Sequence, residues 1–159
     1  EYANFWDNGR KAKAKTLGLS QTEVVVLASI VDQETYIVKE KPIVAGVYVN
    51  RLNKGMRLEA DPTLIFAIGD YTIKRVLDIH KKINSPYNTY KFTGLPPGPI
   101  CMPTISAIDA VLNYSRHDFL FFCAKEDFSG YHNFARTYAQ HRVNARRFRN
   151  ELNKRRIWN

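Results

Sequence analysis

The sequence has few cysteines and no long apolar run. Cys101 and Cys123 are too few for a disulfide framework and lack the spacing of a zinc site. They can pair or stay free, and the apolar run around Cys123 favours a buried, inert thiol. No stretch approaches the roughly 18 apolar residues of a membrane span, and there is no signal-peptide, metal, nucleotide or flavin motif. We therefore expect no cofactor. Because the chain begins at Glu1 rather than Met, we also expect it to be a piece of something longer.

Acidic residues are outnumbered, since 24 Lys and Arg against 15 Asp and Glu give a formal net charge of +9. This balance favours anionic partners such as nucleic acid, acidic glycans or a membrane surface. The last basic cluster has no recognisable DNA or RNA motif, so we interpret it as a solvated face and expect no nucleic-acid partner. Basic residues are concentrated at the two ends of the chain, at Arg10, Lys11, Lys13 and Lys15 and at Arg142, Arg146, Arg147, Arg149, Lys154, Arg155 and Arg156.

Length and composition indicate one globular domain over residues 1–159. Its hydrophobic content of 45% and charged content of 25% are ordinary for a protein with its own core. No internal repeat or low-complexity linker divides it. Several short helical patterns and one hairpin pattern place it in the α+β class, with helices around one central helix and a small antiparallel sheet.

The central helix is predicted over about residues 22–36. Ser20 with Glu23 forms a capping-box signal before an apolar run. Glu34 stands four residues after Ile30 and seven after Leu27, so it continues the apolar stripe of this helix. A carboxyl group in that position is partly desolvated, which raises its pKa and suits it to general acid catalysis. A solvated helix end or half of an ion pair is the structural alternative.

The next helix is predicted from Pro42 to about Leu52, with Gly55 as a left-handed cap. Asn50 and Arg51 fall in its last turn. For these two residues a solvated face and a binding role are equally open.

Asp61, Pro62 and Gly69 indicate a further short helix, with Asp61 as N-cap, Pro62 at the first helical position and Gly69 as the stop. The capping role alone accounts for Asp61, and a catalytic role stays open beside it. An amphipathic segment over residues 73–83 follows.

Residues 84–90 and 94–100 are predicted to form one wall of a groove. The first segment is dense in hydrogen-bonding groups and flat rings, and the second is a proline-rich loop with a rigid backbone. Sugars are held by ring faces and by fixed amide and hydroxyl groups, although a simple structural corner would have a similar sequence.

The C-terminal part is predicted to contain a helix from Ser106 to about Asn113, a buried strand over residues 119–124 and a second strand over 131–135. On the second strand, His132 and Phe134 share a face, and a structural, hydrogen-bonded histidine is the favoured interpretation. A last helix runs from Thr137, which with Gln140 forms a capping box, towards Arg155.

Several of these segments together resemble the catalytic domain of the endolytic murein transglycosylases of the MltG (YceG-like) family. The likeness covers roughly residues 17–148, with five separate motifs in the family's order and spacing. The matching segments are 27–35, 44–52, 55–63, 85–90 and 94–100, followed by the hairpin that carries His132 and Phe134.

The resemblance implies site residues. The catalytic acid of the family is the second Glu of a Glu-x-Glu-Thr segment, which falls on Glu34, on a lysozyme-like catalytic helix. The first acid of that segment is Asp32 here. Residues 102–104 read Met-Pro-Thr where the family usually has Asn-Pro-Gly, a change expected at the lip of the groove. Substrate-binding roles are implied for Asn50, Arg51, Asp61, Thr63, Tyr87, Asn88, Thr89, Tyr90, Pro97, His132 and Phe134.

The reaction implied is cleavage of the β-1,4 bond between N-acetylmuramic acid and N-acetylglucosamine in peptidoglycan, without water, to leave a 1,6-anhydro end. One carboxylate suffices, whereas hydrolytic glycosidases usually need two. The resemblance also implies a full-length protein with an N-terminal transmembrane helix and a LysM-like domain, located in the cytoplasmic membrane with its catalytic domain facing the periplasm or outside. Peptidoglycan synthases are possible partners.

Two other readings remain open from the residues. A lysozyme-like muramidase would use Asp61 as a second carboxylate and release a reducing end. A nucleic-acid-binding module would use the basic last helix, and its affinity would fall steeply with salt.

Overall fold

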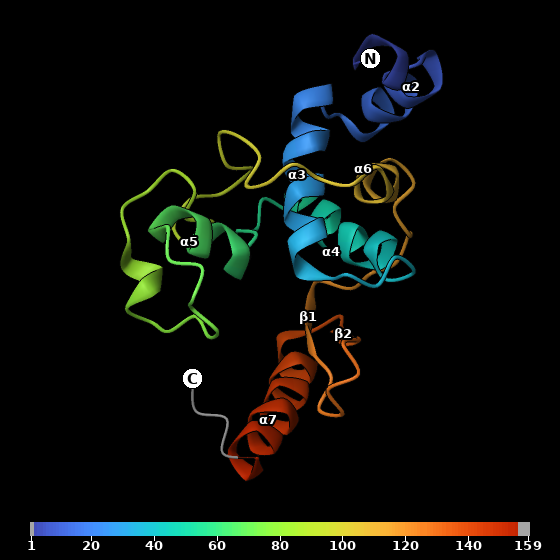
Figure 1. The fold of residues 1–159 in the computed structure, drawn as a ribbon. Helices are drawn as coiled ribbons and strands as arrows, with labels where there is room; N and C mark the ends of the chain where they lie inside the picture. The colour runs from blue at the N-terminus through green and yellow to red at the C-terminus, as the bar shows by residue number, and fades with distance from the viewer. Residues whose placement is uncertain (1, 156–159) are drawn as a thin grey trace.

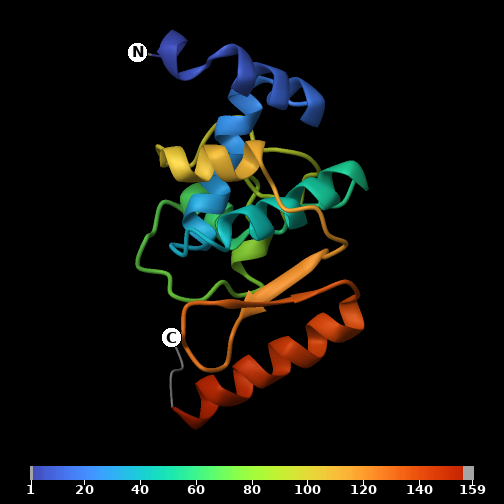
Figure 2. The same cartoon turned by 90° about the vertical axis from the view of Figure 1, so that its right-hand side faces the viewer.

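The computed structural model describes residues 2–155, and its architecture is α+β, as expected. Helix α3 stands at the centre of a helical body and packs against α2, α4, α5 and α6 (Figure 1). A two-stranded hairpin lies between this body and the last helix (Figure 2). The elements are α1 (Tyr2–Phe5), α2 (Asn8–Leu17), α3 (Gln21–Glu34), α4 (Lys41–Asn53), α5 (Asp61–Ile68), η1 (His80–Lys82), α6 (Ile105–Leu112), β1 (Phe121–Ala124), β2 (His132–Ala135) and α7 (Tyr138–Lys154).

Helix α3 begins as predicted. The Ser20 side chain accepts from the Glu23 N–H and the Glu23 side chain accepts from the Ser20 N–H, which completes the capping box. The helix ends at Glu34, earlier than expected, because Thr35 is extended and its hydroxyl accepts from the Ile37 N–H at 3.1 Å. This local bond competes with another helical turn. Glu34 is therefore the last residue of a helix whose middle is buried.

The core of the body is built on the predicted apolar faces. Leu27, Ile30 and Val31 of α3 are fully buried, and Val44, Ala45, Val47 and Tyr48 of α4 pack beside them. Trp6 is also buried, and it lies between the helices α1 and α2, which were not predicted. Within residues 2–155 no single helix is long and apolar enough to cross a membrane, and only α2 and α3 taken together, across an 80° bend, reach that length and composition.

Helices α5 and α6 start differently from the prediction. Ala60, not Asp61, is the N-cap of α5, and Asp61 lies inside the first turn without any capping bond. Its carboxylate is thereby free for other contacts. Helix α6 is capped by Thr104, whose side chain accepts from the Ala107 N–H, so the helix starts before Ser106. Gly69, by contrast, ends α5 with a φ of 78°, as expected.

The segment 73–83 contains only the 3-10 turn η1. The hairpin is antiparallel, as predicted, with Phe122 opposite Phe134. Strand β1 is shorter than expected and half-buried rather than buried. Ala135 is the one residue of the two strands that is buried.

A buried ion pair joins α3, α4 and α6. Lys41 Nζ is hydrogen-bonded to the Asp32 carboxylate, and the two residues are only 4% and 9% exposed. Asp32 also accepts from the N–H and the hydroxyl of Thr104, both at 2.9 Å. Thr104 therefore supports α3 and caps α6. None of residues 102–104 lines the cleft around Glu34, contrary to the expectation that they form its lip.

Replacing Asp32 by Asn should destabilise the fold strongly. The Lys41 ammonium would stay buried without a counter-charge, a loss of about 3 to 5 kcal/mol in unfolding free energy. Urea denaturation followed by circular dichroism measures it. The matched control is Asp78→Asn, which breaks the exposed 3.0 Å pair with Lys81 and should change stability little. Equal effects of the two substitutions would contradict the assigned role of the buried pair.

Candidate active site

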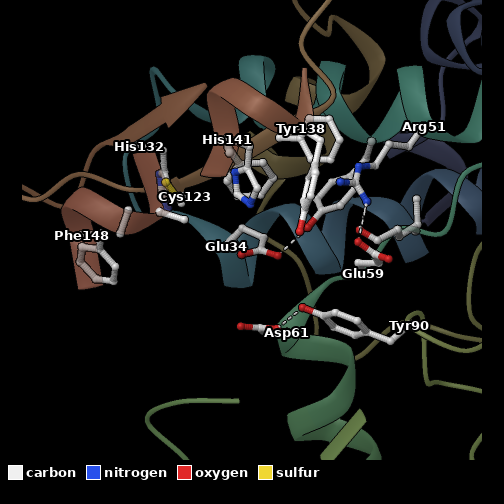
Figure 3. A pocket seen from close by; sticks show the side chains of 16 residues that line it. Glu34, Arg51, Glu59, Asp61, Tyr90, Cys123, His132, Tyr138, His141 and Phe148 are labelled. Carbon is white, nitrogen blue, oxygen red and sulfur yellow. Dashed lines mark hydrogen bonds and ion pairs between the residues drawn. The ribbon is translucent and has the colours of Figure 1, made fainter. Parts of the chain in front are cut away.

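A cleft of about 440 Å³ lies where the end of α3 meets α4, the start of α5, β1 and α7. Figure 3 shows Glu34 near its middle, between Asp61 and His141. Aromatic rings and carboxylates dominate the walls, a combination suited to sugar rings and their hydroxyl groups. The lining residues are Glu34, Tyr48, Arg51, Leu58, Glu59, Asp61, Tyr90, Phe121, Phe122, Cys123, Ala124, His132, Tyr138, His141, Ala145 and Phe148.

Glu34 is the carboxylic acid of this cleft whose pKa is raised to near neutrality. Burial at the end of α3 raises its pKa from 4.5 to about 7. The Tyr48 hydroxyl, which donates to Glu34 Oε1 at 2.5 Å, lowers the pKa, and the negative charge of Asp61 raises it. The side chain thus holds its proton up to neutral pH and can both release and retake it, as a general acid–base must.

Asp61 and Tyr90 form a second polar pair in the same cleft. The Tyr90 hydroxyl donates to Asp61 Oδ1 at 2.5 Å (Figure 3). Burial raises the pKa of Asp61, while the bond from Tyr90 and the charge of Lys81 lower it. The structure thus brings a second carboxylate, predicted first as a cap, into the site of Glu34.

Arg51 lines the cleft, but its guanidinium N–H groups bind backbone carbonyl groups of the surrounding chain. Its guanidinium donates to the carbonyl groups of Leu120 at 2.6 Å and Arg57 at 2.8 Å, and it pairs with Glu59 at 3.5 Å. The neighbouring Asn50 donates to the His117 and Phe119 carbonyl groups and does not line the cleft. Neither residue lies on a solvated face. Both fix the chain that leads into β1.

The predicted wall over residues 84–90 contributes mainly scaffolding. Asn88 is fully buried and donates to the carbonyl groups of Lys81 and Ile83, while its own oxygen accepts from the Tyr90 N–H. Thr63 and Thr89 are buried against each other, with hydroxyl groups 2.8 Å apart. These bonds hold Tyr90, which does face the cleft.

Three further predicted residues lie away from the cleft. The Tyr87 ring packs on Phe66 at 4.8 Å. Pro97 lines a separate hollow with Phe92 and Leu95. Phe134 packs on the ring of Phe122 and supports β1 from the second strand. Of the predicted residues, the cleft therefore brings together Glu34, Arg51, Asp61, Tyr90 and His132.

Other lining residues were not predicted as site residues. Tyr48 falls on the apolar face of α4, so its pattern indicated core, and only the position of its hydroxyl reveals the partnership with Glu34. His141 lies on α7, which was predicted only as a helix, so nothing in the sequence pattern placed this side chain in the cleft. Cys123 is unpaired and half-buried, and burial raises its thiol pKa to about 11, which fits an inert thiol.

A single near-neutral carboxylic acid, held at the end of a core helix and facing an aromatic cleft, defines the class of general acid–base sites. Comparison with known sequences identifies the protein family in which this site occurs. A family model described as the YceG-like family matches residues 1–147, and the chain belongs to that family.

Relatives and a solved structure agree with the assignment. An endolytic murein transglycosylase of Bacillus subtilis (strain 168) is 38% identical over 117 residues, covering 74% of this chain and 32% of that protein. One from Streptococcus pneumoniae serotype 2 is 34% identical, covering 69% and 21%. The crystal structure of a YceG-like protein of Listeria monocytogenes, 34% identical, superposes with a TM-score of 0.76 over 84% of this chain and 43% of that one. The chain thus spans about a third of the first relative and about a fifth of the second.

Glu34→Gln should change how stability depends on pH. In the wild type the folded state keeps the Glu34 proton up to about pH 7, whereas the unfolded chain loses it near 4.5, so stability falls as pH rises through this window. The neutral amide avoids the loss, and by pH 8 the variant should gain about 2 to 3 kcal/mol relative to its difference at pH 4. Urea denaturation at the two pH values measures it. Glu151→Gln is the control: the bond from Arg155 lowers the pKa of Glu151, so this variant should change with the opposite sign between the two pH values, and only slightly because Arg155 is exposed. A constant difference for Glu34→Gln would contradict the raised pKa.

Proposed function

We propose that this chain cleaves peptidoglycan glycan strands as an endolytic murein transglycosylase, breaking the bond between N-acetylmuramic acid and N-acetylglucosamine without water. The observation that carries the proposal is the Glu34 side chain. It has a pKa of about 7 and lies in a cleft lined by aromatic rings. The names of the Bacillus subtilis and Streptococcus pneumoniae relatives support the same reaction.

In the first step Glu34 acts as the acid. Because Tyr48 donates to Oε1, the acidic proton belongs on Oε2. That proton passes to the glycosidic oxygen as the bond from this oxygen to C1 of the muramic acid breaks, and positive charge develops at C1. The carboxylate left behind, with the charges of Asp61 and Glu59 in the same cleft, stabilises this positive charge.

In the second step the same carboxylate acts as the base. The C6 hydroxyl of the muramic acid attacks C1, and its proton returns to Glu34. The new bond from O6 to C1 gives the 1,6-anhydro ring, and the enzyme regains its starting protonation state. No water is consumed, so no second carboxylate has to activate one.

A hydrolytic muramidase would use the same cleft with Asp61 as its second carboxylate. The two reactions differ by one water in the mass of the product. Since the relatives are named transglycosylases, the non-hydrolytic reaction is the one that we propose.

For the longer protein we propose anchorage in the cytoplasmic membrane, with this domain on the periplasmic or outer side, beside peptidoglycan synthases. Its support is the family resemblance of the sequence and the site's fit to glycan strands. Protease accessibility of the domain in intact spheroplasts tests the orientation.

Digestion of purified, uncrosslinked glycan strands tests the reaction. The wild type should release 1,6-anhydro fragments, and Glu34→Gln should be slower by at least about 100-fold because an amide cannot deliver the proton. Liquid chromatography with mass spectrometry identifies the ends. Fragments one water heavier would assign the chain to the hydrolases, and Asp61→Asn would then be expected to abolish activity as well.

The rate should fall as pH rises through about 7, where Glu34 loses its proton. Tyr48→Phe removes a bond that lowers the pKa of Glu34, so this alkaline limb should move to higher pH. Asp61→Asn removes a charge that raises the pKa, so the limb should move to lower pH. Initial rates from pH 5 to 9 measure both shifts. Limbs that move in the same direction, or not at all, would show that another group controls the profile.

A further inference from the structure

The carboxylate of Glu40 joins the catalytic helix to the hairpin. Glu40 is only 4% exposed, directly before α4. Its Oε1 accepts from the backbone N–H of His132 at 2.9 Å, and its Oε2 lies 2.8 Å from His132 Nδ1. The hydroxyl of Thr35, the residue after Glu34, donates to the same Oε2 at 3.5 Å. One buried group therefore contacts both the end of α3 and the start of β2.

This contact fixes the proton on the imidazole of His132. A carboxylate only accepts hydrogen bonds, so Nδ1 must carry the hydrogen. In the neutral ring Nε2 then keeps its lone pair. No residue within the described range 2–155 hydrogen-bonds Nε2, and His132 is one of the residues that line the cleft. The ring meets Phe122 edge-on, with centroids 5.4 Å apart, so its orientation is held as well.

Three other polar side chains of the cleft already donate their hydrogen bonds to groups of the protein. Tyr48 and Tyr90 donate their hydroxyl hydrogens to carboxylates, and Arg51 donates to backbone carbonyl groups. His141 also lines the cleft, and its Nδ1 is buried without a hydrogen-bond partner among the described residues. In the neutral ring, His132 Nε2 is thus an acceptor without a protein partner in a cleft whose other acceptors include the carboxylates of Glu34, Glu59 and Asp61.

We propose that Glu40 is a positioning residue that holds His132 with its proton on Nδ1, so that Nε2 accepts a hydrogen bond from a hydroxyl or acetamido N–H of the sugar bound beside Glu34. The inference rests on the proposed function, since it assigns a further substrate contact to the same site. Because Glu40 also contacts Thr35, the acid and this acceptor keep a fixed relation to each other.

Glu40→Gln tests the proposal. The amide can still accept from the His132 N–H, but it offers an N–H to Nδ1, which moves the ring proton to Nε2 and replaces an acceptor by a donor. ¹⁵N NMR of the imidazole should show protonated Nδ1 in the wild type and protonated Nε2 in the variant. The specificity constant kcat/KM on uncrosslinked strands should fall by roughly 10- to 100-fold while the circular dichroism spectrum is retained.

The matched control is Glu126→Gln. Glu126 accepts from Asn133 in the same hairpin at 2.9 Å but does not line the cleft, so neither the His132 proton nor turnover should change. A neutral wild-type ring protonated on Nε2 would overturn the proposal, as would a moved proton with unchanged kcat/KM.

A binding readout separates this proposal from the reaction itself. In the inactive Glu34→Gln background, uncrosslinked strands should shift the Nε2 resonance of His132, and the shift should be lost in the double variant with Glu40→Gln. A shift without any wild-type turnover would reject the proposed reaction and keep the His132 contact. No shift with bound strands would overturn the contact. If Glu40→Gln does not fold, the wild-type proton position and the response in Glu34→Gln decide the question.

Discussion

The desolvation of Glu34 is the constraint on which the site depends. A carboxyl group in water would be ionised well below neutral pH. Burial at the end of α3 is the largest cause that raises the pKa of Glu34 to about 7, and the charge of Asp61 adds to it. Such a position has a cost, because the fold must keep an acidic group away from solvent. Tyr48 limits this cost with one hydrogen bond to Oε1, which also leaves the second oxygen to exchange a proton with a ligand.

The rest of the cleft is held by polar side chains whose bonds point into the protein. Arg51 and Asn88 donate to backbone carbonyl groups outside the α-helices and the strands. Buried carbonyl groups without partners would be energetically costly. Such residues are as necessary to the site as those that face it, although they need not touch a sugar. Their contribution is to place Tyr90 and β1 at fixed positions around Glu34.

The sequence predicted the parts of the molecule that depend on local rules. The capping box of α3, the left-handed end of α5 and the hairpin follow from short-range patterns, and so does the apolar stripe that ends at Glu34. Predictions that required a partner in space were less successful. The sequence around Asp61 is that of a helix cap, but its contact with Tyr90 joins residues 29 positions apart. The Asn88 amide could bind a sugar, but in this fold it donates to backbone carbonyl groups instead. The helical or strand periodicity of a sequence cannot predict such contacts between distant residues.

The two departures from the family's sequence pattern are in contact with each other. Asp32 stands where the pattern has Glu, and Thr104 stands where it has Gly, and the shorter acid accepts hydrogen bonds from both the N–H and the hydroxyl of Thr104. A glycine at position 104 would offer no hydroxyl to Asp32. Through these bonds Asp32 and Thr104 support α3, and neither residue lines the cleft. Since Lys41 and α6 are bonded to the same carboxylate, this altered junction still fixes the helix that carries Glu34, and the chemistry at its end needs no corresponding change.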